Sequence, residues 1–227
     1  MVLFCHITSQ IPGVKYDGLL SEKGGRGFPY LVYLDAAGGV LTSPKGRSVS
    51  AFADGLADAR KEAERIAELR KKAAGGDRAA VAQLLETELK TGRITLAEAQ
   101  KRRAELKDLD AATAQALDSA ILDAEVRGVM GSLRSRDDLP KAAEAFRAMH
   151  AAGRVPSGEN AASFWNILFT DAEARQDSAY AETALEAVRK VAGTDQRMGM
   201  LVKNLESRLA KMKEGGAPAP ESKPTTK

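Results

Sequence analysis

The spacing of apolar residues changes near residue 48, and this change limits the fold more than any other feature of the sequence. Residues 30–35 (YLVYLD) form a short and nearly continuous apolar run, which is typical of a β-strand buried on both faces. From Ser48 onward apolar residues recur every three or four positions, which indicates amphipathic helices. The sequence therefore predicts a small α/β segment followed by an all-helical region.

The first part of the chain predicts the order strand, helix, strand, strand, helix. Residues 2–9 (VLFCHITS) are β-branched and aromatic and predict a strand, and a short helix fits residues 17–23. The glycines of residues 36–39 (AAGG) predict a hairpin turn into a returning strand over residues 40–42. A long helix over residues 48–74, ended by a glycine pair, closes this segment.

Beyond residue 76 the sequence predicts only helices. Their expected spans are 77–92, 95–106, 110–133, 139–152, 159–174, 177–192 and 195–213. Short turns between them favour an array of antiparallel helical hairpins, which resembles TPR-like helical repeats weakly. Residues 214–227 are proline-rich and polar, as disordered tails are. We therefore expect three parts, at 1–74, 77–213 and 214–227.

Composition restricts the classes of partner and cofactor. The 34 basic and 31 acidic residues are interleaved and leave a net charge of only +3, which argues against nucleic acid. A single cysteine and two histidines leave little for a metal site, and no phosphate-binding loop is present, so we expect no metal or cofactor. No stretch is apolar for long enough to span a bilayer, and residues 1–6 do not resemble a signal peptide. The sequence is that of a soluble protein and names no compartment.

Residues 2 to about 70 resemble the C-terminal half of a thioredoxin-like domain. The most specific part is GFPYLVYLDAAGGVL at 27–41, where Pro29 falls at the position of the family's cis-proline. In the family this loop binds the extended backbone of a client by strand-like pairing. The resemblance therefore implies that Phe28 and Pro29 contact a protein or peptide client. A trans proline that merely introduces a strand is the alternative, and we favour the cis bond.

The family's redox pair, a CxxC motif, lies on a strand and helix that would precede residue 2. Cys5 matches neither cysteine of the motif, so we expect non-catalytic binding and no enzyme activity in the chain as given. One alternative is a truncated thiol-disulfide oxidoreductase whose active-site segment lies upstream of Met1, and we expect such a longer parent. Another is a helical scaffold formed by residues 77–213. A sheet lacking its neighbours would also favour self-association through its exposed edge.

Two further sets of residues are candidate sites. Cys5 and His6 are neighbours on a predicted strand and point to opposite faces, so a buried, inert Cys5 is favoured over a reactive thiol. Phe164, Trp165 and Phe169 make one helix apolar around most of its circumference. A buried helix core is favoured there over a groove that anchors a partner side chain.

Overall fold

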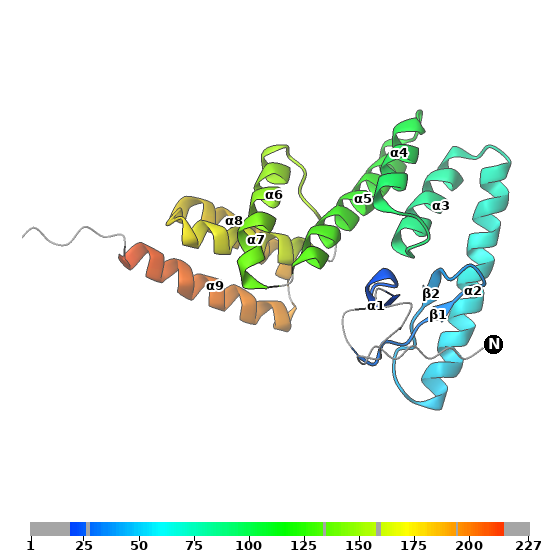
Figure 1. Cartoon of the computed structure of the whole chain (residues 1–227), viewed down its shortest axis with the longest axis horizontal. Helices are drawn as coiled ribbons and strands as arrows, with labels where there is room; N and C mark the ends of the chain where they lie inside the picture. The colour runs from blue at the N-terminus through cyan, green and yellow to red at the C-terminus, as the bar shows by residue number, and fades with distance from the viewer. Residues whose placement is uncertain (1–18, 26–27, 134, 158–159, 194, 216–227) are drawn as a thin grey trace, which may run out of the picture. The chain divides into compact units, whose positions relative to one another are not determined.

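The computed structural model describes residues 19–25, 28–133, 135–157, 160–193 and 195–215. These residues form mostly helices, together with one small antiparallel sheet (Figure 1). Contacts divide the chain into two compact units, residues 1–121 and 122–227. The division falls inside helix α5 (Ala111–Ser132), whereas the sequence predicted a boundary between residues 74 and 77.

The first unit contains the sheet and the helices that precede α5. Strand β1 (Tyr33–Leu34) pairs with β2 (Val40–Thr42), with Tyr33 opposite Thr42, Leu34 opposite Val40 and a bulge between the two pairs. The helices of this unit are α1 (Leu19–Glu22), α2 (Val49–Ala74), α3 (Arg78–Lys90) and α4 (Leu96–Glu105). The antiparallel strand pair and the helix that follows it are as predicted, although the first strand covers only Tyr33–Leu34 of the predicted residues 30–35.

Side-chain caps at their N-termini account for the start of three of these helices. The side chains of Ser48, Asp77 and Thr95 accept hydrogen bonds from backbone N–H groups in the first turns of α2, α3 and α4. Of the long apolar stripe of α2, Ile66 and Leu69 are buried, and α3 packs against this helix. The sheet and the first helical pair therefore belong to one packed unit.

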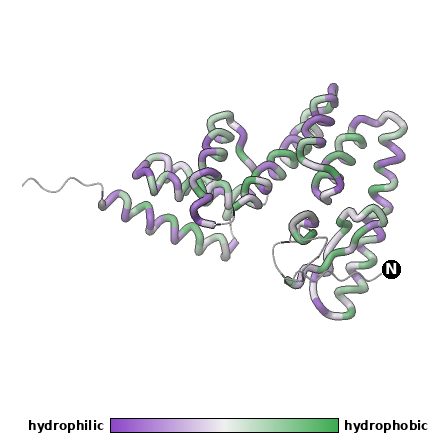
Figure 2. Tube along the Cα trace, viewed as in Figure 1, coloured by the Kyte–Doolittle hydropathy of each residue, from purple (hydrophilic) through white to green (hydrophobic). Residues whose placement is uncertain are grey.

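The second unit is entirely helical in its described part. A short 3-10 turn (Arg136–Asp138) precedes α6 (Leu139–Ala151), and α7 (Ala161–Ala174), α8 (Ser178–Ala192) and α9 (Gln196–Gly215) follow. Helix α7 contacts α6, α8 and α9, and the core gathers around it. Along α9, hydrophobic and hydrophilic residues alternate within the turns (Figure 2), as expected for a helix buried on one face. A repeating array of hairpins stays a prediction.

The strand predicted to be buried on both faces is only partly covered. No residue of β1 or β2 is fully buried, and Leu34 is 39% exposed. The physical reason is that, among the described residues, β1 pairs with β2 alone, so the sheet is too small to enclose its apolar side chains. The predicted strand 2–9 and the tail from residue 216 lie outside the described residues. None of the described helices is long and apolar enough to cross a membrane.

Candidate binding edge at β1

Residues 28–34 (FPYLVYL), which we call the β1 segment, contain the client-binding residues predicted from the sequence. The Phe28-Pro29 peptide bond is cis, as favoured above. The Phe28 side chain is 66% exposed, and Leu31 and Leu34 are each 39% exposed. The segment carries no charged residue. Three apolar side chains are therefore exposed on a segment that no charge interrupts.

Two tyrosines anchor the β1 segment to neighbouring elements. The Tyr30 hydroxyl donates to the Lys23 carbonyl oxygen at 2.6 Å, just after α1, and the Tyr33 hydroxyl donates to the Phe52 carbonyl oxygen of α2 at 2.6 Å. A Cβ added at Gly55 would lie 2.8 Å from the Tyr33 ring, so this glycine lets α2 approach the strand closely. Burial raises the pKa of the Tyr30 phenol. The edge is therefore held in place on both sides.

The turn after β1 is held by a buried ion pair that local sequence patterns do not reveal. The Asp35 carboxylate accepts hydrogen bonds from the N–H groups of Ala37 and Gly39, and Arg93 also donates to it. Burial of the carboxyl opposes its ionisation, but the hydrogen bonds from Gly39 and Arg93 outweigh this, so the pKa of Asp35 lies below its ordinary value. Arg93 follows α3 in the turn before α4, so this turn and the sheet are linked.

The two outer edges of the sheet differ. At β2, the Val40 N–H donates to the Thr91 carbonyl oxygen at 3.3 Å, so part of this edge is occupied by the turn between α3 and α4. At β1, no further strand pairs with the outer edge within the described residues. The free edge is also where Leu31 and Leu34 are exposed. Within the described part of the chain, this segment therefore combines backbone groups without a strand neighbour and exposed apolar side chains.

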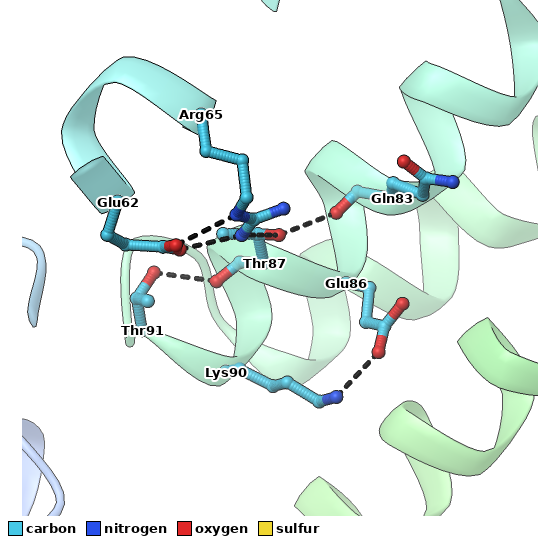
Figure 3. A pocket seen from close by; sticks show the side chains of 7 residues that line it. All are labelled: Glu62, Arg65, Gln83, Glu86, Thr87, Lys90 and Thr91. Carbon is cyan, nitrogen blue, oxygen red and sulfur yellow. Dashed lines mark hydrogen bonds and ion pairs between the residues drawn. The ribbon is translucent and has the colours of Figure 1, made fainter. Parts of the chain in front are cut away.

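A polar hollow of about 230 Å³ lies between α2 and α3 (Figure 3). Arg65 donates to both carboxylate oxygens of Glu62 and to the Thr87 hydroxyl, while Lys90 donates to Glu86. The two cations and two anions that line it are therefore paired with one another. Such pairs are ordinary on helix surfaces, and they give the hollow no net charge for a ligand to use.

The other sequence candidates have different outcomes. Phe164, Trp165 and Phe169 are buried in the core of the second unit. The groove interpretation is therefore wrong for this structure, because these side chains pack against α6, α8 and α9 rather than line a surface. Cys5 lies outside the described residues. No group of three or more His, Cys, Asp or Glu side chains placed to hold a metal ion occurs in the described part of the chain.

A polar cluster that the sequence did not reveal joins three helices of the second unit. The Tyr180 hydroxyl of α8 lies 2.7 Å from Nδ1 of His150 on α6, and the Arg147 guanidinium carbon lies 4.2 Å from the centre of the Tyr180 ring. Arg147 and Arg175 both donate to the carboxylate of Asp171 on α7. Each contact crosses between helices or closes a helix end, so the cluster supports the packing of α6, α7 and α8.

Comparison with protein-family models, curated proteins and solved structures finds no match to this chain.

Proposed function

We propose that this chain is a non-catalytic binding protein with a partial thioredoxin-like domain, and that it takes an extended polypeptide segment at the β1 segment. The observation that carries the proposal is the exposure of Phe28, Leu31 and Leu34 along the β1 segment, whose strand has one neighbour in the described structure. An extended partner can pair with the free backbone groups of this edge while its alternate side chains cover the exposed leucines.

The chemistry of the edge suits binding rather than catalysis. Its side chains are hydrocarbons and phenols, and the Tyr30 phenol has a raised pKa because it is buried. Such groups stabilise a complex by removal of apolar area from water, at about 25 cal/mol for each Å². Backbone pairing supplies the orientation, and the exposed Phe28 ring supplies a contact at the start of the segment. The partner that fits is an extended apolar segment without charges opposite Leu31.

Binding of a fluorescein-labelled peptide tests the proposal. The probe is a peptide of alternating valine and threonine with lysines at its ends, and its fluorescence anisotropy is followed as the full chain is titrated. We expect saturable binding that Phe28→Ser and Leu31→Ser each weaken about tenfold, since each loses roughly 1.4 kcal/mol of contact. Val49→Ser is the matched control, because Val49 is an 88% exposed apolar residue of the same unit that lies on α2, outside the edge.

Two outcomes contradict the proposal. One is anisotropy that does not rise with the full chain at any concentration. The other is an equal loss of binding in the Val49→Ser control and the edge variants, which would indicate non-specific adhesion to apolar surface.

The helical-scaffold function predicted for residues 77–213 stays a separate prediction. The observation relevant to it is the core that α6 to α9 form with the C-terminal part of α5, all within the second unit.

A further inference from the structure

We infer that the partner of the β1 segment is a second copy of this chain, paired antiparallel with β1 about a two-fold axis at Val32. This inference rests on the proposed function, and it identifies the extended partner as the β1 segment of the second copy.

The charge pattern favours a second copy. A two-fold antiparallel interface places the same segment of both chains face to face, so a charge at its centre meets an identical or nearby like charge. Soluble proteins commonly protect sheet edges with charged residues for this reason. Residues 28–34 contain none. Two copies of this segment can therefore lie face to face without repulsion between like charges, which a charged edge strand would not allow.

The positions of the side chains also favour this register. The hydroxyl contacts direct Tyr30 toward the end of α1 and Tyr33 toward α2. In one copy the strand covers only Tyr33 and Leu34. In the proposed pair the strand extends back to Tyr30, and alternate residues of a strand share a face, so Val32 and Leu34 would lie with Tyr30, and Leu31 with Tyr33. With Val32 opposite Val32 of the second copy, Tyr30 pairs with Leu34 and Leu31 pairs with Tyr33. Each is an aromatic–aliphatic pair on one face, the kind that stabilises antiparallel sheets.

The exposed leucines give a third reason. The two-stranded sheet already packs against α2 in each copy, and added strands with an apolar face stabilise a sheet further. Joining two copies through β1 gives the continuous order β2, β1, β1, β2. The same step covers Leu31 and Leu34 of both chains, which are exposed in one copy. The edge at β2 is less suited to this role, because Thr91 already accepts the Val40 N–H.

Engineered cysteines test the register in the full chain. In a Cys5→Ser background, Val32→Cys places two thiols directly opposite, where the Cα atoms of paired strands are about 4.5–5.5 Å apart, within reach of a disulfide. We expect a disulfide-linked dimer on mild oxidation, seen on a non-reducing gel. Leu34→Cys is the matched control. In this register its two thiols are offset by four residues, roughly 13 Å along the strand, and we expect no cross-link.

The mass of the unmodified chain in solution, measured by sedimentation, completes the test. A dimer that Leu31→Lys converts to monomer supports the inference, because two lysines would then lie near the centre of the interface. A monomer at all concentrations overturns it, and so does equal cross-linking at positions 32 and 34, which indicates random collision. Peptide binding is measured separately by anisotropy on dilute protein. A monomer that binds the peptide therefore rejects self-pairing alone, while a chain that neither dimerises nor binds rejects both proposals.

Discussion

Arg93 and Asp35 form an almost buried ion pair across 58 positions of sequence, and this pair joins the turn of the sheet to the turn between α3 and α4. The Arg93 side chain is only 7% exposed, and it lies directly against Gly39. Thr91 accepts hydrogen bonds from both Arg93 and Val40. The first helical pair is therefore part of the support of the sheet.

Replacement of one ion-pair partner is expected to weaken the link between the two turns. Arg93→Ala leaves the half-buried Asp35 carboxylate without its cation, which should lower the free energy of unfolding by about 2 kcal/mol. Amide hydrogen exchange at Gly39 and Val40 measures the effect on the turn itself, and protection there should fall. Lys72→Ala is the control, because the Lys72–Glu68 pair is exposed on α2 and its loss should leave exchange at the turn unchanged. Unchanged protection from hydrogen exchange at Gly39 and Val40 in Arg93→Ala would show that the ion pair does not support the turn.

A side chain at position 39 should displace Arg93. The Cβ of Gly39→Ala would collide with the Arg93 guanidinium, so we expect a destabilisation of roughly 1–3 kcal/mol by overpacking. The collision is absent in an Arg93→Ala background, so a double-mutant cycle should show a smaller cost of Gly39→Ala there. Gly46→Ala, whose Cβ meets nothing nearer than 3.4 Å, is the matched control. Strictly additive effects would show that the two residues do not touch.

The second unit should lose stability in acid. Hydrogen bonds from Arg147 and Arg175 outweigh burial and hold the pKa of Asp171 below its ordinary value, and the hydrogen bond from Arg208 lowers the pKa of Glu173. A carboxyl with a depressed folded pKa stabilises the fold above its unfolded pKa, about 3.9 for Asp, and this stability is lost as the pH falls through the folded pKa. Urea unfolding followed by Trp165 fluorescence at a series of pH values measures it. In Asp171→Asn the free energy of unfolding should fall less steeply with decreasing pH. The same pH dependence as in the unmodified chain would contradict the role given to Asp171.

Tyr180 should contribute through its hydroxyl and its ring separately. Tyr180→Phe removes the hydrogen bond to His150 and keeps the ring beneath Arg147, so we expect a loss of about 1 kcal/mol. Tyr180→Ala also removes the ring, its cation–π contact and its packing, and should cost about 3 kcal/mol or more. Trp165 lies 4.9 Å from His150 between ring centres, so its fluorescence reports both changes. Equal losses in the two variants would mean that the ring contributes nothing.

Local signals predicted most of the secondary structure. The caps at Ser48, Asp77 and Thr95 and the glycines after α2 and α3 act within a few residues, so the helix positions followed from the sequence to within a few residues. Helical periodicity likewise favoured Phe164 and Phe169 as core residues, which the structure confirms. The cis bond before Pro29 was favoured from the resemblance and is present.

Long-range pairing was not predicted, for a physical reason. Arg93 follows α3 in a turn where an arginine is usually solvated, and nothing within ten residues indicates its contact with Asp35. The same holds for Tyr180, whose hydroxyl partner His150 lies on another helix. The degree of burial of β1 also depends on how many strands lie beside it. The apolar run at 30–35 therefore indicated a strand but not its exposure.

In the proposed dimer, the hydrogen bond from Val40 to Thr91 would disfavour the addition of further copies at β2. A sheet open at both edges can add copies without end and grow into a fibre. Here the turn between α3 and α4 occupies part of the β2 edge, whereas the β1 edge has no further strand beside it within the described structure. If two β1 edges meet as proposed, only the partly occupied β2 edges are left, and we expect association to end at a pair.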